Sequence, residues 1–151
     1  MLLSRRLPCG RNGISYERET SLADALAFAQ ADNPSLSEWI AHELSIRNLR
    51  RRDVVRDSRL NQTFCYQIIA GTRRASRDKL LQLAFGMHLG IDATCELLER
   101  GGTNALMPSV PRDVIVAYCL DRRMKIDTCD DLLWARGEQT LVSFEGGHSP
   151  H

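Results

Sequence analysis

Basic side chains are concentrated in one part of this sequence, which we call the cationic stretch, from Arg47 to Lys79. Its basic residues are Arg47, Arg50, Arg51, Arg52, Arg56, Arg59, Arg73, Arg74, Arg77 and Lys79. The same stretch contains only three acidic residues, so its net charge is +7. The rest of the chain has ten basic and sixteen acidic residues, a net charge of −6. A surface of one sign repels itself, so it is either balanced by a polyanion or tolerated as a solvated face.

Within the cationic stretch, polar side chains recur at helical spacing. Gln62, Thr63, Tyr66 and Gln67 are three to four residues apart and share one face of a helix. A long amide can donate and accept in one plane, which is the geometry that reads N6 and N7 of adenine in the major groove. Asn61 at the N-cap leaves the following backbone N–H groups free to point at phosphate. This combination is typical of a helix that contacts DNA.

The sequence contains no motif typical of a catalytic, nucleotide-binding or metal-binding site. The sequence has no G-x-S-x-G, phosphate loop or glycine-rich nucleotide fingerprint, and Cys65 or Cys119 as a nucleophile would need a histidine that cannot be located. The four histidines lack H-E-x-x-H spacing, and the five cysteines, an odd number, contain no C-x-x-C pair. We therefore predict no catalytic residue, no metal, no cofactor and no small-molecule ligand, with reduced and mostly buried cysteines.

Two helical segments must position the polar face. We expect a two-turn helix over residues 51–58 with Val54 and Val55 facing inward, a brief turn over 59–61, and a second helix over 62–70. The remaining inward-facing residues of the pair are Leu60, Cys65, Ile68 and Ile69. This is the pattern of a helix-turn-helix, whose second helix presents its outer face to the DNA groove.

The remaining segments also follow helical periodicity, and none alternates like a half-buried strand. One helix, capped by Ser35 or Ser37, carries Leu36, Trp39, Ile40 and Leu44 on one face. Further helices are expected over residues 77–88, 92–100, 111–123 and 127–136, with stops at Gly71, Gly90, Gly101-Gly102 and Gly137. We therefore predict an all-α protein of short helices with tight connections.

Two of these helical hairpins repeat each other at an offset of 35 residues. The matching residues are Arg77-Asp78 with Arg112-Asp113, Ile91-Asp92 with Ile126-Asp127, Leu97-Leu98 with Leu132-Leu133, and Gly102 with Gly137. We expect Asp92 and Asp127 to be the N-caps of the second helix in each hairpin. Two copies are fewer than the roughly three that a stacked solenoid needs, so we read them as two similar hairpins.

From about residue 36 to 100 the chain resembles the XRE family, the lambda-repressor-like helix-turn-helix proteins of bacteria and phages. The resemblance rests on Val54-Val55, Leu60, Cys65, Ile68, Gly71-Thr72-Arg73, Leu80-Leu81-Gln82-Leu83-Ala84 and Gly90-Ile91. It implies five short helices and sequence-specific DNA binding in transcriptional control. Val55, Arg59 and Ala75 stand where the family usually has Ala, Gly and Pro. A left-handed backbone at Arg59 would cost roughly 1 kcal/mol.

The resemblance also implies roles for individual residues. Gln62, Thr63, Tyr66 and Gln67 are expected to face base edges. The alternative for Tyr66 is packing against neighbouring helices, because a tyrosine ring gains from partial burial. The phosphate contacts it implies are Arg51, Thr72, Arg73, Arg74 and Arg77, beside the N–H groups that follow Asn61.

The 151 residues are enough for one domain with extensions. We expect a flexible arm over residues 1–20, an N-terminal helix over 21–33, a lambda-repressor-like domain over 35–101, a helical hairpin extension over 102–141, and a disordered tail over 142–151. The extension resembles that of a bacterial XRE-like subgroup. No apolar run approaches the roughly 18 residues of a membrane span, and the N-terminus does not read as a signal peptide, so we expect a cytoplasmic protein.

Together these features predict a sequence-specific transcriptional regulator that binds double-stranded DNA. Because single motifs of this kind usually bind as symmetric pairs, we expect a homodimer, for which Leu132-Leu133-Trp134 in the C-terminal hairpin offers a surface. The alternative is a helical interaction module that keeps this fold and binds another protein through its acidic C-terminal hairpins. The two differ in salt dependence, which is steep only for DNA binding.

Overall fold

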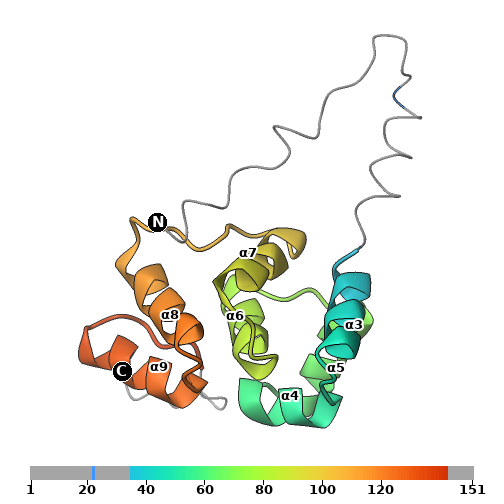
Figure 1. Cartoon of the computed structure of the whole chain (residues 1–151), viewed down its shortest axis with the longest axis horizontal. Helices are drawn as coiled ribbons and strands as arrows, with labels where there is room; N and C mark the ends of the chain where they lie inside the picture. Colours follow the sequence, from blue (N-terminus) through green and yellow to red (C-terminus); the bar gives the residue numbers. More distant parts are fainter. Residues whose placement is uncertain (1–21, 23–34, 143–151) are drawn as a thin grey trace.

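The computed structural model describes residues 22 and 35–142 (Figure 1). Residues 35–142 form seven helices and no strand, which confirms the predicted all-α class for this part of the chain. The helices are α3 (Leu36–Ile46), α4 (Arg51–Ser58), α5 (Gln62–Ala70), α6 (Arg77–Gly86), α7 (Ile91–Arg100), α8 (Pro111–Asp121) and α9 (Ile126–Ala135). None of these seven is both long and apolar enough to cross a membrane.

Three predictions fall wholly or partly on residues outside the described range. These are the arm over residues 1–20, the helix over 21–33 apart from Leu22, and residues 143–151 of the predicted tail. The structure therefore does not test them. Within residues 35–142, every helix predicted from periodicity is present, with ends that differ from the prediction by two residues or fewer.

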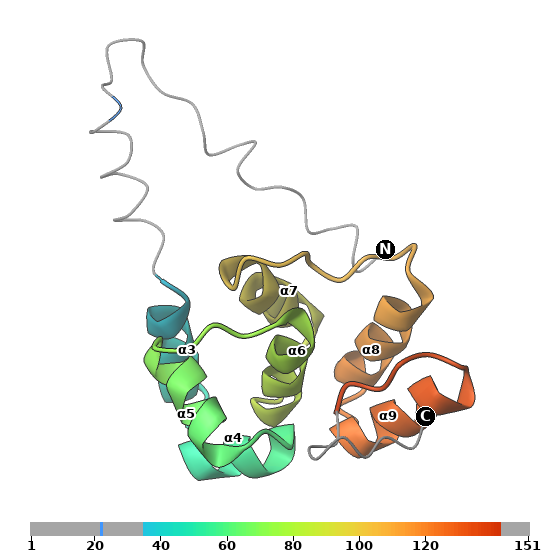
Figure 2. The ribbon, with the colours of Figure 1, turned by 180° about the vertical axis from the view of Figure 1, so that it is seen from behind.

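The helices follow one another along the long axis of the molecule. Helices α3 and α5 lie at one end, α6 and α7 in the middle, and α8 and α9 at the other end, as Figures 1 and 2 show from opposite sides. Helix α4 packs against both α5 and α6, and α6 also packs against α7 and α9. Every residue of α6 from Leu80 to Gly86 is buried. The core is therefore centred on α6, and both ends of the molecule are positioned by it.

A capping box decides where α3 begins. The Ser35 Oγ accepts the N–H of Glu38 at 3.2 Å, and the Glu38 carboxylate accepts the N–H of Ser35 at 3.0 Å. This reciprocal arrangement satisfies N–H groups that the first turn of a helix leaves without an intrahelical partner. Of the two serines suggested by the sequence, Ser35 is the cap, and Ser37 lies within the helix.

Four of the described helix ends turn through a left-handed residue that is not glycine. Arg59 at the end of α4 belongs to the turn before α5, and the other three share one arrangement. Asn48, His88 and Arg123 have φ values of 57°, 58° and 59°. The next residue in each case donates its N–H five residues back, Leu49 to Leu44, Leu89 to Ala84 and Met124 to Cys119, at 2.9 to 3.0 Å. This is the Schellman arrangement, which satisfies carbonyls at the end of a helix. It explains why Gly90, predicted as a stop, is instead the N-cap of α7.

The predicted N-caps of α7 and α9 are wrong by two residues. The N-caps are Gly90 and Lys125, and Asp92 and Asp127 lie inside the first turn. The reason is that each helix already begins at the preceding isoleucine, whose side chain is buried in the core. The two carboxylates still face the positive end of the helix dipole, so their position is favourable without being a cap.

The two hairpins of the sequence repeat are also equivalent in the structure. The paired helix ends Gly86 and Asp121, Ile91 and Ile126, and Arg100 and Ala135 are each 35 residues apart. The contacts between the hairpins are reciprocal, because α6 packs against α9 and α7 packs against α8. The hairpins therefore face each other as the halves of a twofold arrangement would, rather than stacking in one direction as solenoid repeats do.

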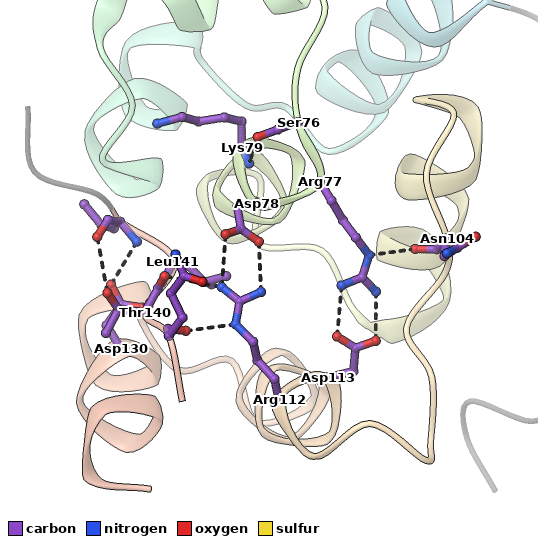
Figure 3. Close-up of polar contacts among 12 residues, drawn as sticks. Ser76, Arg77, Asp78, Lys79, Asn104, Arg112, Asp113, Asp130, Thr140 and Leu141 are labelled. Carbon is purple, nitrogen blue, oxygen red and sulfur yellow. Dashed lines mark hydrogen bonds and ion pairs between the residues drawn. The ribbon is translucent and has the colours of Figure 1, made fainter. Parts of the chain in front are cut away.

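Crossed ion pairs join the two hairpins (Figure 3). Arg77 at the start of α6 donates to both carboxylate oxygens of Asp113, at 2.9 and 2.8 Å, and Arg112 of α8 donates to both oxygens of Asp78, at 2.9 and 3.1 Å. Each guanidinium also donates to two backbone carbonyls, Asn104 and Ala105 for Arg77, and Gln139 and Thr140 for Arg112. Asn104 and Ala105 precede Gln139 and Thr140 by 35 residues, so equivalent contacts hold both hairpins.

Helices α4 and α6 approach each other closely at Gly86. A Cβ atom on Gly86 would lie 2.6 Å from the carbonyl oxygen of Val54 and 2.7 Å from the Cβ of Ser58. A backbone oxygen inside a helix cannot move aside alone, so a side chain here would push the two helices apart. This glycine therefore sets the position of α4, which carries the connection into α5.

Replacing Gly86 tests this contact. Gly86→Ala is expected to lower the free energy of unfolding by about 2 to 3 kcal/mol, because overpacking outweighs the better helix propensity of alanine. Urea unfolding followed by circular dichroism measures the change. Gly90→Ala is the control, since a Cβ there meets no atom within 4 Å, and its cost at an N-cap should stay below about 1 kcal/mol. Equal losses for the two variants would contradict the close contact.

Candidate nucleic-acid interface

The three residues that join α4 to α5 are fixed from their inner side. Arg59 has φ 63° and ψ 20°, the left-handed conformation anticipated for this position. The buried Ser58 donates its hydroxyl to the carbonyl of Val55 at 3.1 Å and accepts the N–H of Leu60 at 3.2 Å. Leu60 is buried as well. The direction in which α5 leaves α4 is therefore determined by a buried hydroxyl and a buried leucine.

The strain at Arg59 is accompanied by an ion pair. A left-handed arginine costs roughly 1 kcal/mol. Its guanidinium donates to the carboxylate of Asp127, at the start of α9, with Nε 3.1 Å from Oδ1. Both side chains are more than half exposed, so the pair contributes at most about 1 kcal/mol. It offsets the strain at best, and it connects the turn before α5 to the second hairpin.

Helix α5 presents its predicted polar face away from the core. Gln62 and Thr63 are exposed, and Tyr66 and Gln67 are half-buried. The opposite side of the helix is buried through Cys65, Ile68 and Ile69, as the sequence predicted. The structure thus brings the four predicted base-contacting residues together on one side of one helix.

Asn61 caps α5, and this uses one of the N–H groups expected to be free. Its Oδ1 accepts the N–H of Phe64 at 3.1 Å. A side-chain oxygen at the N-cap commonly satisfies a donor of the first turn in this way. The prediction that Asn61 leaves the first N–H groups open therefore needs a correction at Phe64, and the N–H groups of Gln62 and Thr63 are those that remain for an anion.

The loop after α5 folds back onto the helix. Thr72 donates its hydroxyl to the carbonyl of Gln67 at 3.3 Å, and Arg73 donates to the Gln67 side-chain oxygen at 3.2 Å. The Arg73 guanidinium also lies over the ring of Phe64, 4.8 Å from its centroid, and the Lys79 ammonium is 5.8 Å from the same centroid. These contacts hold two cations beside the polar face. Sequence reasoning missed Phe64, because no periodic spacing links it to either cation.

A cleft of about 680 Å³ lies between α5, the loop after it and α6. Its lining residues are Arg59, Leu60, Asn61, Thr63, Phe64, Gln67, Arg73, Lys79 and Gln82. Gln82 is buried and donates its amide to the carbonyl of Ser58 at 3.1 Å, while its Oε1 has no hydrogen-bond partner among the described residues. Of the predicted contacts, Asn61, Thr63, Gln67 and Arg73 line this polar hollow, and Arg59 and Lys79 add two further cations to its walls.

Ion pairs divide the basic residues of the cationic stretch into two groups. Four of them bind carboxylates, Arg47 with Glu43, Arg56 with Asp57, Arg59 with Asp127, and Arg77 with Asp113. Six form no ion pair within residues 35–142, namely Arg50, Arg51, Arg52, Arg73, Arg74 and Lys79. The uncompensated positive charge thus lies where α4 begins and where the chain passes from α5 to α6.

Asp57 neutralises one of the paired arginines, Arg56, and also contacts His88. It accepts from the Arg56 Nε at 2.9 Å and lies 3.0 Å from the His88 Nε2. The hydrogen bond from Arg56, followed by that from His88, holds the pKa of the Asp57 carboxyl below its usual range. Asp57 is therefore charged at neutral pH, and it cancels the charge of an arginine that the sequence alone would count as free.

Arg77 is the predicted phosphate contact that the structure does not place with the others. Its side chain is only 26% exposed, and it binds the buried Asp113 and two backbone carbonyls. A buried carboxylate requires a partner of opposite charge, and Arg77 is that partner. The role predicted for Arg77 is therefore corrected to a structural one, while Arg51, Thr72, Arg73 and Arg74 remain exposed.

The described residues contain no cluster of three or more His, Cys, Asp or Glu side chains that could hold a metal. Burial raises the pKa of the Cys65 thiol to about 11, so the thiol stays protonated and weakly nucleophilic at neutral pH. What the arrangement does offer is a row of amide and hydroxyl groups, exposed at Gln62 and Thr63 and half-buried at Tyr66 and Gln67, beside unpaired cations. No protein-family model, curated protein or solved structure that was compared with this chain matches it.

The different roles of Arg77 and Arg73 can be separated by their effects on stability. Arg77→Ala is expected to lower the free energy of unfolding by about 3 to 5 kcal/mol, because it leaves the buried Asp113 carboxylate without a cation, with the N–H of Met107 as its remaining donor. Arg73→Ala removes an exposed contact with a ring and is expected to cost less than about 1 kcal/mol. Urea unfolding of both variants measures the difference. If Arg77→Ala costs as little as Arg73→Ala, Arg77 is a surface residue and the correction fails.

Proposed function

We propose that this chain is a sequence-specific DNA-binding protein of the helix-turn-helix kind that regulates transcription, with α5 in the major groove. The observation that carries the proposal is the row of polar side chains on α5, two exposed and two half-buried, flanked by arginines that no carboxylate neutralises. An α-helix fits the major groove, and phosphates on both sides of the groove attract cations. In this proposal α3 to α7 are the five helices that the XRE resemblance implies.

Base recognition is assigned to the polar face of α5. Gln62 is exposed and free to place its amide against an adenine edge. Gln67 already accepts a hydrogen bond from Arg73, but an amide oxygen has two lone pairs, so it retains one acceptor site and both donors. Arg73 thereby holds the Gln67 amide in one orientation before DNA arrives. Thr63 and Tyr66 are the remaining base contacts in this proposal.

Phosphate contacts are assigned to groups on both sides of α5. On one side are the N–H groups of Gln62 and Thr63 beyond the Asn61 cap, which face the anion-favouring end of the helix. On the other side are Arg73 and Arg74 in the loop after the helix. Arg51 in the first turn of α4 adds a further contact, and Thr72 contributes its hydroxyl if it exchanges its long hydrogen bond to the Gln67 carbonyl. Arg77 is no longer included.

Substitutions on α5 and in the loop should differ in their effect on sequence preference. Once a preferred site has been selected from random DNA, Gln62→Ala or Gln67→Ala is expected to cost about 1 to 3 kcal/mol on that site and to relax base preference. Arg73→Ala is expected to weaken all sequences alike. Fluorescence anisotropy on the selected site and on a scrambled one measures both effects. If all three variants lose the same amount on every sequence, α5 does not read bases.

Salt dependence tests the phosphate contacts separately. The logarithm of the affinity should fall with the logarithm of salt concentration by about 0.9 for each phosphate neutralised, and Arg73→Ala should reduce this slope by about 1. Lys125→Ala is the control, because Lys125 is an exposed cation at the N-cap of α9 in the second hairpin and forms no ion pair within residues 35–142. An affinity that does not change with salt would instead favour a protein partner.

A further inference from the structure

The second hairpin has an open apolar groove of about 720 Å³, which we call the hairpin groove. Val114, Ile115 and Tyr118 of α8 and Leu132 of α9 line it. Val114 is 44% exposed and Tyr118 is 45% exposed. Adjacent large apolar side chains left in contact with water mark a surface that another molecule covers.

The internal repeat shows what this kind of groove accepts. The residues that precede Ile115, Tyr118 and Leu132 by 35 positions are Leu80, Leu83 and Leu97, and all three are fully buried. The two hairpins share the reciprocal contact between them, so the extra burial in the first hairpin comes from α4, which packs on α6, and from α3, which packs on α7. The hairpin groove is thus the uncovered counterpart of a face on which helices pack.

Unpaired charges on α9 indicate which helices would fit. Asp131 and Arg136 lie on opposite sides of the helix stripe formed by Thr128, Leu132 and Ala135. Neither Asp131 nor Arg136 forms an ion pair within residues 35–142. In parallel helix pairs, residues that flank the apolar stripe on opposite sides meet across the interface. A second α9 running parallel to the first would place its Asp131 beside Arg136 and its Arg136 beside Asp131.

We propose that two copies of this chain associate through the hairpin groove, with α8 and α9 of each copy forming a four-helix bundle about a twofold axis. The axis brings apolar side chains against apolar side chains and supplies each unpaired charge of α9 with a partner. Helix α5 lies at the other end of the molecule, so the dimer leaves both polar faces uncovered (Figures 1 and 2). The association needs no DNA and therefore does not rest on the proposed function.

Sedimentation equilibrium of the full chain without DNA tests the dimer. The wild type is expected to show a monomer–dimer equilibrium across a concentration series. Val114→Asp places a charge in the apolar centre of the interface and is expected to raise the dimer Kd by about 100-fold or more. Ile46→Asp is the matched control, since Ile46 is an apolar residue of α3, 60% exposed, at the opposite end of the molecule. It should leave the Kd within about twofold.

A charge exchange tests the orientation of the two copies. Arg136→Asp sets two carboxylates against each other and is expected to weaken the dimer about tenfold. Adding Asp131→Arg to the same chain restores the opposite charges and should return the Kd to within about threefold of the wild type. A variant that had merely lost its fold would not be rescued in this way.

Three results would overturn the proposal. They are a wild type that stays monomeric at every concentration, a dimer that Val114→Asp does not weaken, and a charge exchange without rescue. A monomer that still binds its selected DNA site with a steep salt dependence would refute the dimer and leave the proposed function standing.

Discussion

The crossed pairing of Arg77 with Asp113 and of Arg112 with Asp78 is the constraint on which the rest of the arrangement depends. Asp113 is buried, and Arg77, Asp78 and Arg112 are partly buried. Removing charged groups from water is costly unless each finds a partner and its remaining hydrogen bonds are made. Each arginine meets this condition with one carboxylate and two backbone carbonyls. Only one alignment of the two hairpins makes all of these contacts together, so the network selects that alignment.

The position of α5 follows from this alignment through a short chain of contacts. Arg77 fixes the first turn of α6, and Gly86 in the last turn of α6 receives α4 at a distance that no side chain would allow. The end of α4 then enters the turn at Arg59, which is held from within by Ser58. Side chains on α5 are thus placed by buried contacts that lie on other helices, while the polar face itself is exposed at Gln62 and Thr63.

Much of the fold was predictable because helical periodicity is a local property of the sequence. The spacing of Trp39, Ile40 and Leu44, or of Cys65, Ile68 and Ile69, is visible without knowing what the helix packs against, and these residues are buried as expected. The left-handed turns at Asn48, His88 and Arg123 were harder to predict, since asparagine, histidine and arginine replace the glycine that usually marks such turns. Because His88 makes the left-handed turn, α6 ends before His88, and Gly90, which was predicted to end this helix, begins α7 instead.

The candidate site was less predictable, because the role of a charged residue depends on distant partners. Arg77 stands among other basic residues and reads as a surface cation, but its carboxylate partner is 36 residues away and buried. The sequence did contain a signal, since Arg77-Asp78 and Arg112-Asp113 repeat with opposite charges adjacent, which allows them to exchange partners. Counting charges along the chain showed that the cationic stretch has a net positive charge. Only the ion pairs show which of its cations are not neutralised by a carboxylate.

The contact between Arg59 and Asp127 is the one described link between the turn before α5 and the start of α9, and it sets a limit on communication between the two ends. Any ligand or partner that moves Asp127 would influence α5 through this pair, and α5 would influence that partner by the same factor. An exposed pair is worth about 1 kcal/mol at most, so this route can transmit no more than about a fivefold change in affinity. Because salt screens exposed charges, the transmitted signal would fade as ionic strength rises.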